Sequence, residues 1–128
     1  MCDAQYNDAE VENMAENEQL LNFITELKRG TLTLMVLGCL KEPYYGYALL
    51  QVLQDEAIDI EANTLYPLLR RLEAQGLLNS DWDTAESRPR KYYRISKQGE
   101  EIYRSLREQW QLMQTSVEKI CKEDRDYE

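Results

Sequence analysis

Hydrophobic and polar positions along this chain follow a helical period, then a strand-like one, then a helical one again. The first 19 residues are polar and acidic with scattered apolar side chains, which indicates a weak helix or a partly ordered extension. Residues 20–40 are apolar almost all round, so we expect a helix buried on several sides, with a partner subunit over one face. Gly30 interrupts this segment as a joint or a close helix contact. Pro43 disfavours helical backbone at the residue before it and therefore ends the helix.

Two shorter helices are predicted next. Residues 45–55 carry Tyr47, Leu50 and Leu53 at the spacing of one buried helix face. A further helix begins near residue 63 or 64, where an asparagine and a threonine are both suitable caps. Pro67 would fall in the first turn of this helix, and Gly76 is placed as its C-terminal stop.

A hairpin and a long helix complete the pattern. Residues 77–82 and 91–95 are strand-like, and the polar segment 83–90 between them is typical of a hairpin turn. Ser96 then caps a helix whose apolar positions recur at intervals of four and three, as in a coiled-coil seam. The seam positions are Ile102, Leu106, Trp110, Met113, Val117 and Ile120.

This order predicts a mainly α fold with a small β-hairpin: a winged helix-turn-helix followed by a long C-terminal dimerisation helix. In that fold the helix from residue 63 or 64 enters the DNA major groove and the hairpin lies against the backbone. We expect an acidic N-terminal extension over 1–19, a winged helix-turn-helix DNA-binding domain over 20–96, a dimerisation helix over 97–122 and a tail over 123–128. A length of 128 residues suits one domain with an appended helix.

The distribution of charge changes the picture that the net charge of −9 gives. Residues 1–22 hold six acids and no base, whereas residues 23–117 are close to neutral. Within the neutral part, residues 87–99 hold five bases and no acid. Because salt screens distant charges within about 10 Å, this local basic segment matters more for phosphate contact than the average over the chain.

Several classes of function are disfavoured by what the sequence lacks. It has no histidine, no nucleophile or phosphate-binding motif, and three widely spaced cysteines without a C-x-x-C pair. We therefore expect no enzyme, no cofactor, no metal and no disulfide framework, and we interpret Cys39 as a buried small hydrophobe. A redox role for Cys2 or Cys121 stays open. The sequence has no signal-peptide pattern and no apolar run near the ~18 residues that span a bilayer, so we expect a cytoplasmic protein.

Three motifs in order resemble the PadR family of bacterial transcriptional regulators. They are YGY at 45–47, TLYPLLRRLEAQGLL at 64–78 and RPRKYYRISKQG at 88–99. The resemblance spans about residues 27 to 120 and implies a homodimeric repressor that binds operator DNA. Since one helix follows Gly99, the chain is similar to the short subfamily. In the family a glycine often precedes the proline of the hairpin, whereas Arg88 stands there in this chain, so the turn conformation is open.

Candidate DNA contacts lie on the predicted third helix and the hairpin. The resemblance implies that Tyr66 faces DNA. Asn63 and Thr64 gain from the positive end of the helix dipole, and Arg70 shares the face of Tyr66. On the hairpin, we interpret Arg88, Arg90 and Lys91 as phosphate contacts. A further contact with the DNA backbone is expected from Lys28, which lies shortly before Gly30. Alternatives are capping for residues 63 and 64, core packing for Tyr66, a solvated face or an ion pair with Glu73 for Arg70, and a solvated surface for the hairpin bases.

The apolar seam of the last helix is the second candidate site. In a two-fold dimer, copies of one position can meet near the axis. The short-subfamily resemblance implies that Trp110, with Leu106, Met113 and Val117, lines a central cavity for flat aromatic effectors. The alternative is dimer-core packing without a cavity. For the whole protein, the competing hypotheses are a protein-interaction adaptor that keeps the fold without operator binding, and a protein that sequesters small molecules in the dimer cavity.

Overall fold

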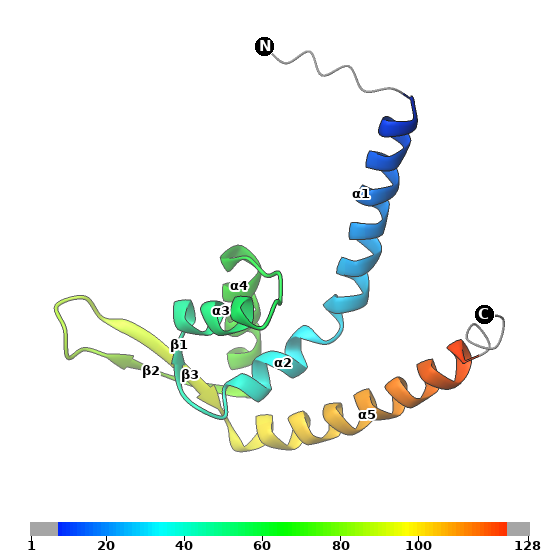
Figure 1. The fold of residues 1–128 in the computed structure, drawn as a ribbon. Coiled ribbons are helices and arrows are strands. Elements are labelled where there is room, and N and C mark those ends of the chain that lie inside the picture. Colours follow the sequence, from blue (N-terminus) through cyan, green and yellow to red (C-terminus); the bar gives the residue numbers. More distant parts are fainter. Residues whose placement is uncertain (1–7, 123–128) are drawn as a thin grey trace, which may run out of the picture. The chain divides into compact units, whose positions relative to one another are not determined.

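The computed structural model describes residues 8–122, which divide into two compact units between Leu32 and Thr33. Figure 1 shows the elements in chain order. They are α1 (Asp8–Arg29), α2 (Leu32–Cys39), β1 (Tyr44–Tyr45), α3 (Gly46–Asp55), α4 (Ala62–Ala74), β2 (Leu78–Asp83), β3 (Arg90–Ile95) and α5 (Lys97–Cys121). The mainly helical fold with a small antiparallel sheet confirms the predicted fold class.

The expected single helix over residues 20–40 is wrong, because α1 ends at Arg29 and α2 begins at Leu32. The carbonyl of Lys28 accepts from both the backbone N–H (3.1 Å) and the hydroxyl (2.8 Å) of Thr31, which closes the end of α1. Gly30 is the joint and not a close contact, since nothing lies within 4 Å of the place where a Cβ would sit. The helix α1 also crosses the expected boundary at residue 19, so the domain division stays a prediction.

Within the first unit, α1 presents large apolar side chains to solvent. Phe23 and Leu27 are exposed, and so are Met14, Leu20 and Leu21. The acidic residues of the same helix are exposed as well. A helix of this kind does not bury its own hydrophobic surface, so its apolar side chains are available to another surface.

The hydrophobic core belongs to the second unit and is made mainly of leucine and valine side chains from α2, α3 and α4. The fully buried ones are Val36, Leu37, Leu40, Leu49, Leu53, Leu65, Leu69 and Leu72. On α3 the predicted face is partly wrong, because Leu49 rather than Tyr47 lies beside Leu53 in the core. Cys39 is half-buried rather than fully buried, and burial followed by the nearby Glu56 carboxylate raises the pKa of its thiol.

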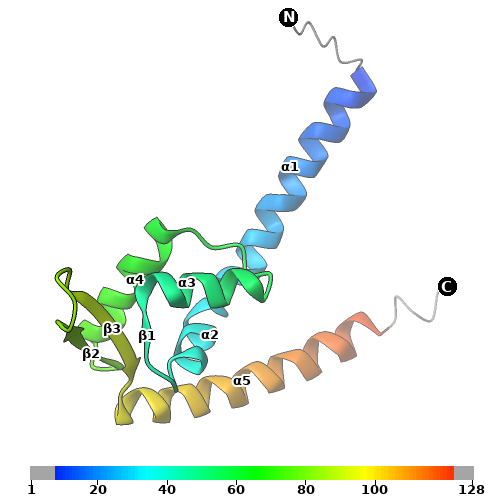
Figure 2. The ribbon, with the colours of Figure 1, turned by 60° about the vertical axis from the view of Figure 1, so that its left-hand side comes forward.

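A three-stranded antiparallel sheet closes one side of this core, with β3 between β1 and β2 (Figure 2). The predicted hairpin is confirmed, with Leu78 opposite Ile95 and Asp83 opposite Arg90. The strand β1 was not expected, and its two tyrosines pair with Tyr93 and Tyr92 of β3. We call the hairpin of β2 and β3, residues 78–95, the wing.

The two ends of α4 differ in how well the sequence predicts them. Glu61, without a side-chain cap bond, precedes the first residue Ala62, so the expected caps Asn63 and Thr64 already lie inside the helix. Pro67 therefore sits in the second turn rather than the first. The C-terminal end is as predicted: Gly76 has φ +81° and donates to Glu73 (2.9 Å), a backbone form that glycine adopts at low cost.

One serine ties the end of α4 to the start of α5. The Ser96 hydroxyl donates to the carbonyl of Gly76 (2.6 Å) and accepts from the N–H of Gly99 (2.9 Å), which confirms Ser96 as the cap of α5. A Cβ on Gly99 would overlap the carbonyl oxygen of Leu77, so only glycine allows α5 to begin this close to the end of α4. We call this contact the Ser96 bridge.

The long helix α5 is mostly exposed in the single chain. Near its start, Tyr103 lies against Gly38 of α2, where a Cβ would be 3.1 Å from the ring, and the ammonium of Lys41 lies 4.5 Å from the ring centre. Beyond that contact the predicted seam is uncovered, with Trp110 and Met113 exposed by 41% and 62%. An apolar stripe of this length is typical of a helix that packs along another helix.

Candidate nucleic-acid interface

The exposed side of α4 carries polar side chains without a partner among residues 8–122. Asn63, Thr64 and Arg70 are exposed, and none of their side chains makes a hydrogen bond or an ion pair with any residue from 8 to 122. The alternative that Arg70 pairs with Glu73 is therefore wrong. These three side chains are available to a ligand, and the N–H groups of the first helical turn add a positive partial charge beside Asn63 and Thr64.

Tyr66 occupies an intermediate position between core and surface. Its ring lies directly against Gly46, the first residue of α3, where a Cβ would be 3.2 Å from Cζ and nearer still to Cε1. The side chain is half-buried. Tyr66 thus helps to hold α3 and α4 together while part of its ring stays exposed.

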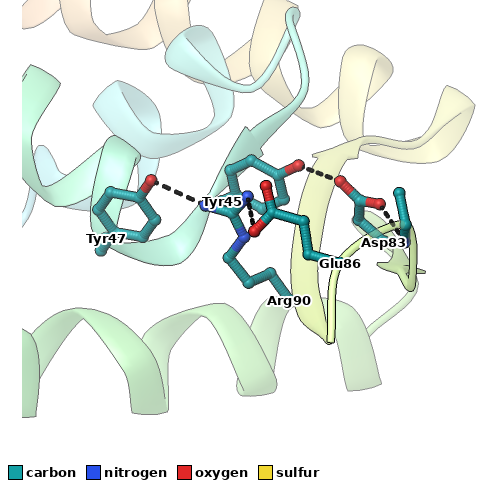
Figure 3. A network of polar contacts seen from close by, with 6 residues as sticks. Tyr45, Tyr47, Asp83, Glu86 and Arg90 are labelled. Atoms are coloured by element: carbon teal, nitrogen blue, oxygen red, sulfur yellow. Dashed lines mark hydrogen bonds and ion pairs between the residues drawn. The ribbon is translucent and has the colours of Figure 1, made fainter. Parts of the chain in front are cut away.

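Arg90, at the first position of β3, is held on three sides (Figure 3). Its guanidinium carbon lies 4.6 Å from the ring centre of Tyr45, and one of its nitrogens donates to the hydroxyl of Tyr47 at 3.2 Å. Another nitrogen forms an ion pair with Glu86 at 3.3 Å. A phosphate that binds Arg90, as predicted, therefore has to displace the carboxylate of Glu86 or share the guanidinium with it.

The base of this cluster is fixed by a tyrosine and an aspartate. The hydroxyl of Tyr45 donates to the carboxylate of Asp83 at 2.5 Å, and the N–H of Ala85 donates to the same carboxylate at 3.0 Å. These hydrogen bonds, the one from Tyr45 first, lower the pKa of Asp83, and the same contact raises the pKa of Tyr45. Asp83 stays charged and Tyr45 stays protonated, so the turn of the wing is anchored to β1.

Lys91 is held on the face of the wing toward α4. Its ammonium lies 3.0 Å from the carboxylate of Glu73 and 5.2 Å from the ring centre of Tyr93. The hydroxyl of Ser80 donates to the other oxygen of Glu73. The bond from Ser80, followed by that from Lys91, lowers the pKa of Glu73, and Glu73 raises the pKa of Lys91. Lys91 thus joins the wing to α4, whereas its predicted phosphate contact is untested.

The remaining predicted contacts differ in position. Arg88 is exposed in the turn of the wing and has no ion pair or hydrogen bond within residues 8–122. Lys28 is exposed in the last turn of α1, in the other compact unit, so its contact with DNA stays a prediction. Two exposed side chains were not among the predicted contacts: Arg94 on the outer face of β3, and Trp82 near the end of β2.

The predicted effector residues are not among those that line a pocket beside α5 in the described part of the chain. This pocket has a volume of about 470 Å³ and is lined by polar and charged residues. Its lining is Lys41, Glu100, Tyr103, Arg104, Arg107, Glu108 and Gln111. Trp110 and its neighbours on the seam are instead exposed, so a site built from them needs a second surface to enclose it.

Within residues 8–122, none of the helices has both the length and the apolar composition that a bilayer span requires. No group of histidine, cysteine and acidic side chains within the same range is arranged to hold a metal ion.

Comparison with known proteins identifies similar regulators. The model of the transcriptional regulator PadR-like family matches residues 34–105. A PadR family transcriptional regulator from Eggerthella lenta DSM 2243 is 50% identical, with a TM-score of 0.81, over 84% of this chain and 96% of that one. A PadR-like transcription factor from Bacteroides fragilis is 32% identical, with a TM-score of 0.66, over 77% and 98% of the two chains. A Streptococcus transcriptional regulator is 34% identical, with a TM-score of 0.67, over 75% and 97%. None of the curated protein sequences matches the chain.

Proposed function

Because this chain belongs to the PadR-like family of transcriptional regulators, we propose that it is a homodimeric repressor that acts in the cytoplasm and binds operator DNA through α4 and the wing. The observation that carries this proposal is the set of unpaired polar side chains on α4 beside a wing whose orientation is fixed by two separate polar clusters.

In the proposed complex, α4 enters the major groove. Asn63 and Thr64 lie at its N-terminal end, where they reach phosphates or base edges, and Arg70 binds a phosphate about two turns later. Tyr66 contacts the DNA backbone with the part of its ring that does not lie against Gly46. A recognition helix of this kind reads sequence through few side chains, so its placement against the wing matters as much as its composition.

Some basic residues of the wing bind phosphate, and another fixes the orientation of the wing against α4. Arg88 binds phosphate directly, because its guanidinium has no partner within the described residues. Arg90 binds phosphate by exchanging the carboxylate of Glu86 for it, because an ion pair with an exposed acid is weak in water. Lys91 acts through Glu73 by holding the wing at a fixed angle to α4.

A second copy of the chain covers the seam of α5 in this proposal. The uncovered stripe from Leu106 to Val117 supports it, since leaving so much apolar surface in water is unfavourable. Two recognition helices about 34 Å apart then meet successive major grooves on one side of the duplex. Aspartate in place of Leu106 is expected to yield a monomer, which sedimentation velocity detects.

An effector site at the dimer axis deepens the proposal. Two copies of Trp110, with Leu106, Met113 and Val117, would enclose a flat aromatic molecule between indole rings. Binding there would change the spacing of the two recognition helices and release the DNA. Quenching of tryptophan emission by planar aromatic compounds, together with their effect on DNA affinity, tests this site.

The experiment that tests the proposed function is a titration of labelled promoter DNA of the protein's own gene at several salt concentrations. If the dimer neutralises ~6–8 phosphates, the logarithm of the affinity falls with that of salt at a slope of about −5 to −7. Arg88→Ala lowers both the affinity and the slope, and Tyr66→Ala lowers the affinity. Lys119→Ala, at the far end of α5, is the matched loss of a positive charge and changes neither.

One observation favours a second candidate, a protein-interaction adaptor without operator binding. Arg90 is paired with Glu86 and Lys91 with Glu73, which leaves Arg88 and Arg94 as the unpaired bases of the wing in an acidic protein. The adaptor hypothesis predicts no binding to any duplex by a folded dimer. A genome-wide selection of bound DNA fragments separates the two, because the adaptor enriches none.

A further inference from the structure

The surface where α4 meets the wing carries an indole with no partner. Trp82 is 59% exposed, and its ring makes no hydrogen bond or ring contact with any residue from 8 to 122. Its neighbour across the sheet is Lys91. Since residues opposite one another in an antiparallel pair lie on the same face, Trp82 stands on the face of the wing toward α4.

This face forms one continuous surface with the exposed side of α4. Lys91 is joined to Glu73 by an ion pair, and Glu73 lies three residues after Arg70, so these two positions are neighbours on the helix surface. Trp82 and Arg70 therefore flank the ion pair from the wing side and from the helix side. We call the surface of Arg70, Glu73, Lys91 and Trp82 the α4–wing junction.

The proposed function determines what this surface meets. With α4 in the major groove and the wing on the flanking DNA backbone, the DNA strand that runs from α4 to the wing has to cross the α4–wing junction. There the charge of Glu73 is balanced by Lys91, so the acid does not repel a phosphate. An arginine and an aromatic ring beside one another match the alternation of phosphate and apolar deoxyribose along a DNA strand.

We propose that Trp82 is a DNA-contacting residue, whose indole packs against a deoxyribose of the strand whose phosphate Arg70 binds. This inference rests on the proposed function. It assigns the junction a contact that does not depend on base sequence, because every nucleotide offers the same sugar and phosphate. The contact would fix the register of the wing and add no charge.

Random-sequence duplex at low salt is a sufficient probe, since the contact is independent of sequence. The variants are Trp82→Ala, Trp82→Phe, Arg70→Ala and Asn79→Ala, the last an exposed change on the same strand but on its opposite face. Trp82→Ala is expected to weaken binding about fivefold to tenfold with an unchanged salt slope, because an apolar contact releases no counterion. Arg70→Ala is expected to weaken binding and reduce the slope by about one for each phosphate lost. Trp82→Phe retains most of the affinity, and Asn79→Ala retains all of it.

A second measurement does not depend on the variants' affinity. The indole N–H signal of Trp82 in the nitrogen–proton correlation spectrum is identified by its loss in Trp82→Phe, and it is expected to shift when duplex is added to the wild-type protein. If the wild-type protein binds duplex while this signal stays in place and Trp82→Ala binds as tightly, the inference is overturned and the proposed function stands. If the folded wild-type dimer binds neither random nor genomic duplex, the proposed function fails and the inference fails with it.

Discussion

The guanidinium of Arg90 lies 3.3 Å from the carboxylate of Glu86, four residues earlier in the turn of the wing. The acid occupies the side of the arginine that the stacked rings of Tyr45 and Tyr47 leave open. In the proposed complex, Glu86 would therefore compete with a DNA phosphate for the guanidinium of Arg90.

Replacing Glu86 with glutamine is expected to tighten binding to duplex DNA by about twofold to fivefold for each wing that binds, the range for an exposed ion pair. Fluorescence anisotropy with labelled duplex measures the change. Glu108→Gln, an equal change of charge in α5, controls for the general effect of removing an acid. Equal effects of the two substitutions would mean that Glu86 acts only through net charge.

The acid sensitivity of the wing is expected to depend on Glu73. The pKa of this carboxyl is lower in the folded protein than in the unfolded chain, because Ser80 and Lys91 bind its charged form. The stabilising contribution is therefore complete above the unfolded pKa and is lost as the pH falls through the folded value. Wild-type protein should lose more stability than Glu73→Gln as the pH is lowered from 7 to about 3.

Thermal unfolding at a series of pH values gives this comparison. At neutral pH the Glu73→Gln variant is less stable by up to about 1 kcal/mol, since the pair is partly exposed. The difference narrows at acid pH. A constant gap over the whole pH range would contradict the role of the charged carboxylate.

Gly46 is expected to tolerate no side chain while Tyr66 is present. A Cβ at this position overlaps the tyrosine ring, so Gly46→Ala should lower the free energy of unfolding by about 1–3 kcal/mol. In a Tyr66→Ala background the same substitution should cost less, because the obstructing ring is gone. Denaturant unfolding of the four proteins in this cycle measures the coupling. Additive costs would show that the strain at Gly46 has another source.

Ala57, two residues after the end of α3, has a left-handed conformation with φ 61°, which residues other than glycine adopt at a cost. Its N–H donates to Gln54 and the next one donates to Leu53, as at the end of α4. Ala57→Gly should therefore raise the free energy of unfolding by about 0.5–1 kcal/mol. Ala48→Gly, inside the same helix, should lower it by a similar amount. A loss of stability in both variants would contradict the strain at Ala57.

The sequence predicted the parts of the fold that depend on local chemistry. Gly76 and Ser96 were placed correctly because a helix end needs a left-handed residue or a capping oxygen, whatever surrounds it. The predicted face of α3 is wrong at Tyr47, because helical spacing alone does not show which side of the helix packs against α4. Packing against α4 puts Leu49 inside, while Tyr47 remains outside as a partner of Arg90.

The contacts within the candidate site, by contrast, could not be predicted from local sequence. Charge patterning singled out the bases of the wing but gave no information about their partners. The ion pair of Lys91 joins it to Glu73, 18 residues away, and exists only because the wing folds back onto α4. Trp82 was missed for a related reason: in the sequence it is an ordinary strand residue, and only the sheet register shows which face it occupies.

The Ser96 bridge has a mechanical consequence. The hydroxyl of Ser96 binds both the carbonyl of Gly76, just after α4, and the N–H of Gly99 in the first turn of α5. Gly99 also lies directly against the carbonyl of Leu77, so the ends of the two helices are in close contact. Because Ser96 joins the two helices, a rotation of α5 is expected to rotate α4 as well. In the proposed dimer, a shift of one α5 against the other would therefore change the position of the proposed recognition helix through Ser96.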